Sequence, residues 1–279
     1  MVKVLKSGFF TSIQDNGRFG YRNKGVPISG AMDKKALDKA NLLLENPHNA
    51  PVLEITMTGP TLLFENRTFI CLTGAELSAT LNNEPITNYM VHEVQKGDIL
   101  SYGRLESGFR GYLAVKGGFK TEVVLGSSSQ YLPLTSAKCI AEFEELVFEE
   151  AANFKPKITA LKIGSYFQDR QLKVQKGPEY GMLSDEQLKL LFSKEFTVAK
   201  ENNRMAYQLN EHLPKHTNSM LTSATLAGTV QVTPAGKLII LMKDGQTTGG
   251  YPRILQLSEE AICVLAQKRA GDGISFKLT

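Results

Sequence analysis

The chain has 279 residues and carries 32 Lys and Arg against 28 Asp and Glu, which gives a formal net charge of +4. Its hydrophobic content of 42% and charged content of 22% are ordinary for a soluble globular protein, and its length can bury one large core or two modest ones. The longest aliphatic run, residues 238–242, is too short to span a bilayer, and the N-terminus lacks the apolar core of a signal peptide. We therefore expect a cytoplasmic protein that does not contact membranes. The three well-separated cysteines predict neither a disulfide framework nor a metal site.

Charge is distributed unevenly along the chain. Residues 1–150 hold 15 Lys and Arg against 17 Asp and Glu, whereas residues 151–279 hold 17 against 11. This asymmetry fits either two solvated surfaces of different character or a basic surface that meets an anionic ligand or an acidic partner. Nucleic acid is not an expected partner, because the basic residues are scattered and no stripe of stacking aromatics accompanies them.

The first half of the chain predicts strands and one helix. The helix is expected over residues 32–45, where an apolar face is formed by Ala36, Leu37, Ala40, Leu43 and Leu44. A hairpin is expected over residues 76–87, because Asn82 and Asn83 tolerate the positive φ of a tight turn. Residues 95–98 predict a turn into a strand at 99–102, and a further strand is expected at 111–115.

The second half predicts more strands and two helices. Strands are expected at 157–163, 229–232 and 237–242. A helix over 184–196 opens with Ser184 and Gln187 in capping-box spacing, and one over 258–267 carries acids in its first turn, where the helix dipole favours them. The acidic-to-basic junction near residues 149–157 predicts two β-rich lobes, residues 1–152 and 153–279.

Common catalytic and cofactor signatures do not occur in the sequence. There is no Gly-x-Ser-x-Gly nucleophile elbow and no Walker A loop, so ATP is not expected to bind here through a P-loop. His212 and His216 have helical spacing, but Pro214 lies between them and no His-Glu-x-x-His pattern exists, so no metal site is expected.

Three polar, glycine-containing clusters are the strongest functional signal. They span residues 11–20, 27–33 and 244–252. Each offers backbone N–H groups together with amide, hydroxyl or carboxylate side chains, a combination that suits a small polar substrate or an oxyanion. The same residue types are also what ordinary turns require.

In content and order these clusters resemble the signature segments of the KipA family, which includes the second subunit of allophanate hydrolase and the C subunit of 5-oxoprolinase. The family's Thr-x-x-Gln-Asp-x-Gly-Arg segment is matched by residues 11–18, Gly-x-Pro-x-Ser-Gly-Ala-Met-Asp by 25–33, and Asp-x-Gln-Thr-Thr-Gly-Gly-Tyr-Pro by 244–252. Further matches are Ala40-Asn41, residues 53–60, Gly74-Ala75, residues 110–118, Leu125-Gly126-Ser127 and residues 265–267. The resemblance thus covers nearly the whole chain.

One segment departs from the family pattern in a way that bears on chemistry. The family's Ser-Asp-Arg-Met-Gly-Tyr-Arg-Leu reads here as residues 202–209, with Asn203 in place of the acid and Gln208 in place of the second Arg. The loss of one acid and one base is consistent with altered chemistry or a different substrate. A smaller change places Thr233 where the family usually has proline.

The resemblance implies a mainly β protein with cyclophilin-like β-barrel architecture, in two β-rich lobes with a few short helices. It also implies a KipI-like partner subunit and a third, LamB/YcsF-like subunit, in an assembly that hydrolyses the lactam 5-oxoproline to glutamate with ATP as co-substrate. We expect the chain alone to be inactive.

Two alternatives stay open. The first is a biotin-dependent carboxyltransferase half-enzyme acting on urea-like amides, with biotin on another protein because this chain has no Met-Lys-Met attachment motif. The second is a non-catalytic regulator that binds a KipI-like kinase inhibitor.

The resemblance and the cluster chemistry together select the candidate site residues. Arg18, Arg110 and Arg204 would supply positive charge for a phosphorylated or carboxylated oxyanion, although Arg18 could instead pair with Asp33 and brace a loop. The carboxylates are the acid–base candidates, and Gln14, Gln246, Thr247 and Thr248 would hydrogen-bond an amide. The catalytic set is Asp15, Arg18, Asp33 and Glu54; the substrate-binding set is Gln14, Ser29, Gly30, Arg110, Arg204, Gln246, Thr247, Thr248, Gly249 and Gly250.

Overall fold

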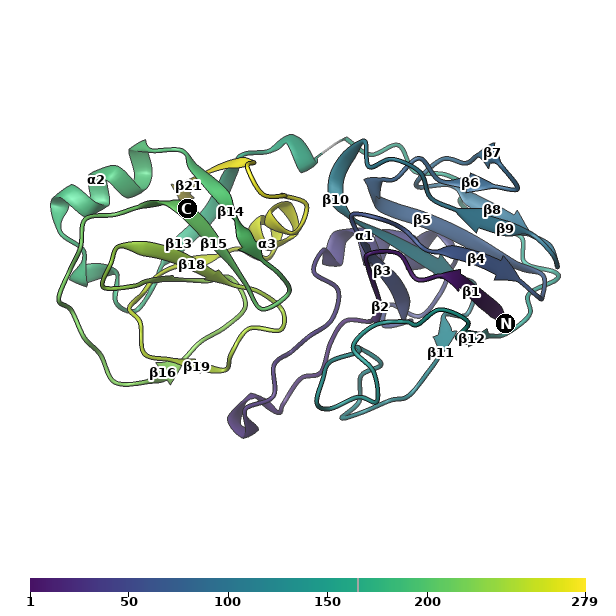
Figure 1. The fold of residues 1–279 in the computed structure, drawn as a ribbon, viewed down its shortest axis with the longest axis horizontal. Coiled ribbons are helices and arrows are strands. Elements are labelled where there is room, and N and C mark those ends of the chain that lie inside the picture. The colour runs from purple at the N-terminus through teal and green to yellow at the C-terminus, as the bar shows by residue number, and fades with distance from the viewer. Residues whose placement is uncertain (165) are drawn as a thin grey trace. The chain divides into compact units, whose positions relative to one another are not determined.

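The computed structural model describes residues 1–164 and 166–279 (Figure 1). These residues divide into two compact units: the first comprises Met1–Arg18 and residues 29–164, and the second comprises Phe19–Ile28 and Tyr166–Thr279. The division after residue 164 lies beyond the expected junction at 152, and residues 19–28 belong to the unit whose other residues begin more than a hundred positions later.

The first unit holds two antiparallel sheets and one helix. Its strands are β1 (Val2–Lys6), β2 (Phe10–Gln14), β3 (Val52–Thr56), β4 (Thr61–Phe64), β5 (Thr68–Glu76), β6 (Thr80–Leu81), β7 (Glu84–Pro85), β8 (Val91–Val94), β9 (Ile99–Ser101), β10 (Ser107–Val115), β11 (Phe119–Lys120) and β12 (Glu145–Phe148). The seven-stranded sheet has the order β11-β12-β1-β4-β9-β6-β7, and the five-stranded sheet has the order β2-β3-β10-β5-β8.

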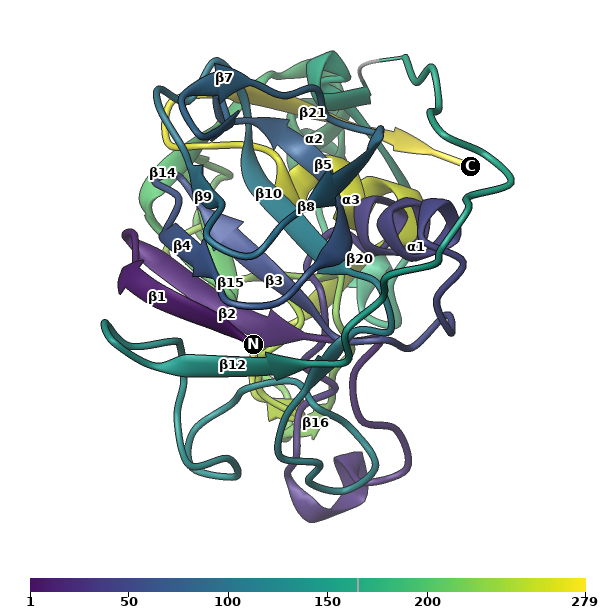
Figure 2. The same cartoon turned by 90° about the vertical axis from the view of Figure 1, so that its right-hand side faces the viewer.

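Both faces of the five-stranded sheet are covered, which explains why β5 reads as a nearly continuous buried run. Ile70 and Leu72 lie in one apolar cluster with residues of the seven-stranded sheet. The intervening Phe69 and Cys71 lie in a second cluster with the helix α1 (Lys34–Leu43). Successive side chains of a strand point to opposite faces, so α1 packs against the face turned away from the other sheet (Figure 2).

The second unit is built on a closed seven-stranded barrel. Its strands are β13 (Gln171–Lys176), β14 (Phe196–Asn202), β15 (Ala206–His212), β17 (Thr229–Val232), β18 (Lys237–Leu241), β20 (Arg253–Leu257) and β21 (Gly273–Leu278), in the order β13-β20-β17-β18-β15-β14-β21. The parallel pairing of β13 with β21 closes the ring. A separate two-stranded ribbon joins β16 (Ser223–Ala224) to β19 (Thr248–Gly249).

Helices of the second unit are short and capped by their own sequence. They are the 3₁₀ turns η1 (Arg22–Lys24), η2 (Tyr166–Gln168) and η3 (Tyr180–Met182) and the helices α2 (Asp185–Ser193) and α3 (Glu259–Ala266). Ser184 and Gln187 form the expected capping box, and Ser258 accepts from the Ala261 N–H. No helix in the described part of the chain is both long and apolar enough to cross a membrane.

The mainly β, barrel-containing fold with a few short helices confirms the expected class. The hairpin turn at Asn82 and Asn83 has φ of 53° and 68°, as a tight turn requires, although its strands β6 and β7 are shorter than expected. The strand expected at 157–163 is wrong. That stretch contributes only an isolated bridge between Ala160 and Met90, because its hydrogen bonds to the chain at residues 89–91 end at the start of β8 and do not continue along that strand.

Candidate functional site

The predicted site residues fall into two sets, one on each unit. The first unit carries Gln14, Asp15, Arg18, Ser29, Gly30, Asp33, Glu54 and Arg110, and the second carries Arg204, Gln246, Thr247, Thr248, Gly249 and Gly250.

Asp15 follows β2 and is enclosed by hydrogen-bond donors. Its Oδ1 accepts from Gly17 N at 2.8 Å and from the Ser127 and Ser129 hydroxyls at 2.6 Å each, while Oδ2 accepts from Ser128 N at 2.7 Å. The residue is 5% exposed. Four donors saturate most of a carboxylate's acceptor capacity, so this geometry favours a brace between the residue 14–17 turn and the 127–129 loop.

Gln14 and Arg18 extend that brace. Gln14 Nε2 donates to Ser12 Oγ at 3.0 Å and to the Gln130 carbonyl at 3.3 Å. Arg18 Nη2 donates to the Ser129 carbonyl at 2.5 Å, and the guanidinium is buried. Both side chains thus tie the first polar cluster to the segment around residue 129.

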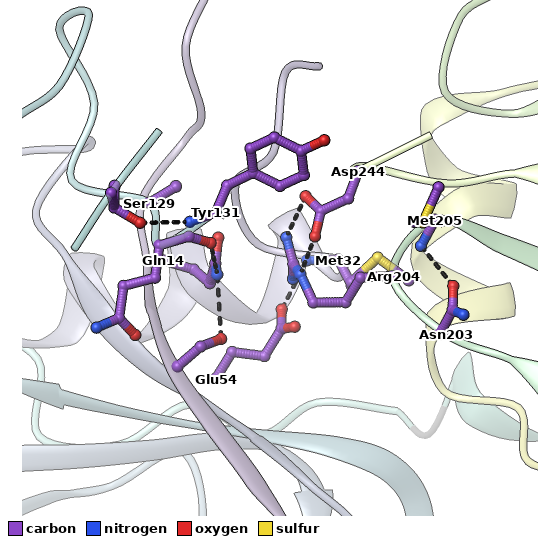
Figure 3. Close-up of polar contacts among 12 residues, drawn as sticks. Gln14, Met32, Glu54, Ser129, Tyr131, Asn203, Arg204, Met205 and Asp244 are labelled. Carbon is purple, nitrogen blue, oxygen red and sulfur yellow. Dashed lines mark hydrogen bonds and ion pairs between the residues drawn. The ribbon is translucent and has the colours of Figure 1, made fainter. Parts of the chain in front are cut away.

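Glu54 lies at the centre of a second buried network. Its Oε2 accepts from Met32 N at 2.7 Å, a contact drawn in Figure 3, and from the Tyr112 hydroxyl at 2.8 Å. The Arg110 Nε lies 3.8 Å from Glu54 Oε1, and both side chains are almost fully buried. A buried carboxylate needs such partners, because an isolated buried charge is strongly unfavourable.

Asp33 and Tyr112 connect this network to α1. Asp33 Oδ1 accepts from Ala36 N at 3.2 Å and caps the helix, while the Asp33 N–H donates to the Tyr112 hydroxyl at 2.8 Å. Burial, reinforced by the nearby carboxylates of Glu54 and Asp33, raises the pKa of Tyr112 well above its ordinary value. Tyr112 therefore stays protonated and acts as a donor to Glu54.

Ser29 and Gly30 form the tight bend that precedes the cap. Both have positive φ, 56° and 81°, and a Cβ at Gly30 would lie 2.8 Å from Gly17 N, so only glycine fits there. Ser29 is fully buried and its hydroxyl has no hydrogen-bond partner among the described residues. A strained, buried serine with an unsatisfied hydroxyl is typical of functional positions.

Arg204 of the second unit is held by Asp244. The two form a bidentate pair, Nε to Oδ2 at 2.7 Å and Nη2 to Oδ1 at 3.1 Å (Figure 3), with 8% and 10% of their side chains exposed. The backbones also meet, because Asp244 N donates to the Arg204 carbonyl at 2.8 Å. The pair fixes the start of the 244–252 loop.

The departure at Asn203 keeps the turn intact. Its Oδ1 accepts from Met205 N at 2.7 Å and from Ala206 N at 3.1 Å. An aspartate oxygen could accept the same two bonds, so the substitution removes a charge without removing the turn-forming acceptor.

The loop over residues 244–252 folds back on the barrel. The Thr225 hydroxyl donates to the Gln246 carbonyl and the Thr225 N–H donates to the Thr247 carbonyl, while Thr248 and Gly249 form β19. Beyond the loop, Arg253 forms a bidentate pair with Glu179, with Nε to Oε2 at 2.8 Å and Nη2 to Oε1 at 2.7 Å. Gln246, Thr248 and Gly250 are exposed.

Two cavities adjoin predicted residues. One of about 330 Å³ lies beside Asp15 and is lined also by Lys120, Phe119 and Ser128. The other, of about 120 Å³, lies beside Gln246 in the second unit. Within residues 1–164 and 166–279 no cluster of three or more His, Cys, Asp or Glu could hold a metal ion.

Several participants are missing from the predicted set. Tyr112 joins Glu54 and Asp33, Ser127 and Ser129 bind Asp15, and Asp244 holds Arg204. Their sequence signal is weak: Tyr112 and Ser127 lie inside matched family segments, but their partners are more than fifty residues away in sequence.

Two curated relatives match the chain over most of their own length. It is 33% identical to the C subunit of the Escherichia coli 5-oxoprolinase, over 99% of this chain and 90% of that protein. It is 34% identical to the Haemophilus influenzae protein of the same name, over 99% and 91%.

A solved structure and a family comparison agree with this result. The crystal structure of the Kluyveromyces lactis urea carboxylase superposes with a TM-score of 0.88 at 28% identity, covering 99% of this chain and 27% of that one. Residues 24–278 match the family described as carboxyltransferase domain, subdomain A and B. The chain therefore belongs to the carboxyltransferase-domain family, subdomains A and B.

Proposed function

We propose that this chain is a subunit of an ATP-dependent 5-oxoprolinase-type complex that hydrolyses the 5-oxoproline lactam to glutamate, together with a KipI-like and a LamB/YcsF-like subunit. The observation that carries the proposal is the similarity to the C subunits of two bacterial 5-oxoprolinases, which extends over about nine-tenths of each. By contrast, the chain matches only 16% of the length of the Saccharomyces cerevisiae urea amidolyase, at 28% identity.

The acid–base role belongs to Glu54 in this proposal. Its carboxylate is oriented by Met32 N and the Tyr112 hydroxyl, and Arg110 lies beside it. General acid–base catalysis by a carboxylate requires a fixed orientation, and these three contacts supply it for Glu54. Asp15 and Asp33 act by positioning, because the first anchors a loop and the second caps α1.

ATP would supply activation of a poorly electrophilic lactam carbonyl, and we propose that a partner subunit binds it. Neither cavity next to the predicted residues fits a triphosphate. The larger one has the Asp15 carboxylate in its wall, and the Lys120 ammonium at its edge already lies 3.0 Å from Glu149. The smaller one, at about 120 Å³, lies below the roughly 300–1,000 Å³ typical of larger ligands.

The test is co-expression with the KipI-like and LamB/YcsF-like subunits, followed by an assay for glutamate release from 5-oxoproline. We expect release that requires ATP and all three chains. Glu54→Gln, which keeps the side chain's shape, should lower kcat roughly 100-fold or more. The exposed Glu142→Gln is the matched control. An assembled complex that releases no glutamate contradicts the proposal, and tight binding of the KipI-like chain in that case points to a regulator instead.

A second candidate function rests on the family match and on the superposition with a urea carboxylase. It is carboxyl transfer from a biotin carried by another protein to a urea-like amide. ATP-independent decarboxylation of a carboxybiotinylated carrier by the complex, accelerated by urea but not by 5-oxoproline, would favour it.

A further inference from the structure

The cavity beside Gln246 lies on one face of the barrel sheet. Ile239 of β18 pairs directly with Gln231 of β17 and with Gln208 of β15, so these three side chains share a face. Ala206 and Leu241 pair in the adjacent row of the same strands. The alternating residues Leu238 and Ile240 are fully buried on the opposite face.

The 244–252 loop closes over this face and brings two carboxamides together. Both Gln231 and Gln246 line the cavity. A Cβ on Gly249 would lie 2.6 Å from Gln231 Nε2 and 3.0 Å from Gln246 Nε2, so the two amides converge on the bare glycine. Gln231 is 1% exposed, and its Nε2 donates to the Tyr251 carbonyl at 3.3 Å. The buried amide is thereby held in place from the loop.

The lining combines neutral amides with an apolar floor. Ala206, Ile239 and Leu241 supply the floor, and Tyr251 stands at the rim with 41% exposure. None of the described residues that line the cavity carries a charge. Such a site favours a small neutral group that has both apolar surface and an amide edge.

We infer that this cavity is the subsite that binds the ring of the lactam, with the Gln231 and Gln246 carboxamides reading its amide edge. A five-membered lactam holds N–H and C=O on one edge, in the cis arrangement that a carboxamide can match with two hydrogen bonds. Its ring methylenes would contact Ile239 and Leu241. Urea offers a similar polar edge but no methylene, so the floor selects against it.

The choice of a lactam rests on the proposed function, so the test measures binding to the 279-residue chain without its partners. The probe is 2-pyrrolidinone, a plain lactam, titrated against protein with 13C-labelled isoleucine methyl groups. We expect the Ile239 signal to shift in a saturable manner, while that of Ile240, its neighbour on the opposite face, stays in place. Urea at the same concentration should leave Ile239 unshifted.

Variants separate amide recognition from nonspecific contact. Gln231→Leu should weaken 2-pyrrolidinone binding roughly tenfold, the loss expected when one buried amide pairing disappears. The matched control is Gln208→Leu, the same change in the same row at a residue that does not line the cavity, and it should leave binding unchanged. An unshifted Ile239 signal, an equal response to urea, or undiminished binding by Gln231→Leu overturns the inference.

The two proposals fail separately. If the complex releases glutamate but 2-pyrrolidinone does not shift the Ile239 signal, the subsite is overturned and the proposed function is unaffected. A lactam-dependent Ile239 shift in a chain whose complex releases no glutamate supports the subsite and overturns the function.

Discussion

At the scale of single residues, the polar side chains of the matched segments have two structural roles: some are buried inside the unit, and others accept hydrogen bonds from the backbone of turns and of a helix start. The buried Ser29 hydroxyl has no partner among the described residues, so neither capping nor bracing accounts for it. The buried Glu54 carboxylate accepts both from a backbone N–H, that of Met32, and from the Tyr112 hydroxyl. Asp15, Asp33 and Asn203 instead satisfy backbone N–H groups of turns and a helix start. The residue types alone could not distinguish these roles, because both roles use carboxylates, amides and hydroxyls.

The turn at Asn203 gives a first prediction. Asn203→Ala removes the acceptor for Met205 N and Ala206 N and should lower the free energy of unfolding by about 1 kcal/mol. Asn203→Asp retains an acceptor oxygen and should stay close to the parent. Urea denaturation of the three proteins measures the difference. Equal stability of the alanine and parent proteins would show that the turn does not depend on this side chain.

Asp15 gives a second prediction. Three consecutive serines donate hydrogen bonds to the Asp15 carboxylate. Asp15→Asn removes the charge and one of the two acceptor oxygens, and should lower the free energy of unfolding by about 1–3 kcal/mol. Asp38→Asn on the exposed face of α1 is the control, with an expected change of at most about 0.5 kcal/mol. The measurement is again denaturant unfolding. A change at Asp15 no larger than at Asp38 would rule out the bracing role.

At the scale of elements, local signals are reliable and long-range pairing is not predictable. The helix starts at Ser184 and Ser258 could be predicted because capping involves residues three positions apart. The parallel pairing of β13 with β21 joins residues about a hundred positions apart and has no local signature. The same reason explains residues 157–163, whose alternating pattern fits a strand although their pairing with the chain at the start of β8 is limited to a single bridge.

The anchor of the 244–252 loop gives a prediction on pH. Hydrogen bonds from Arg253 hold the pKa of Glu179 below its ordinary value. Because the folded-state pKa is the lower one, the pair stabilises the fold above the unfolded-state pKa, and this contribution is lost as the pH falls from about 4.5 through the lowered value.

Hydrogen exchange of residues 244–253 between pH 7 and pH 3 measures that loss. We expect protection to fall in the acid range for the parent but to be lower and flatter across pH for Glu179→Gln. Glu195→Gln, which breaks the exposed pair with Arg170, should behave like the parent. A parent loop that is equally protected at both pH values contradicts the prediction.

At the scale of the whole molecule, the chain passes between its units more than once. It leaves the first unit after Arg18, returns at residue 29, and leaves again after residue 164. Residues 19–28 are fastened within the second unit, where the Arg22 guanidinium donates to the Thr225 carbonyl. A boundary drawn from composition could not reveal this, because nothing in the composition of residues 19–28 indicates that they belong to the second unit.

This connectivity predicts that a single cut will not release the second unit. With a protease site inserted after Gly164, we expect the two cleaved pieces to co-elute in gel filtration, because residues 19–28 of the first piece belong to the second unit, where Arg22 donates to the Thr225 carbonyl. Replacement of residues 19–28 by a Gly-Ser linker of equal length should weaken that association. Separation of the parent pieces on the column would contradict the prediction.

The excursion of residues 19–28 also imposes an order on biosynthesis. This segment leaves the ribosome before most of its unit has been made, and at typical translation rates on the order of ten seconds pass before Thr225 exists to receive Arg22. The first unit can meanwhile complete both sheets and α1, since all of their strands are encoded before residue 149. During this time residues 19–28 lack the second-unit residues that they contact in the folded protein. In the nascent chain this segment is therefore accessible to chaperones and proteases.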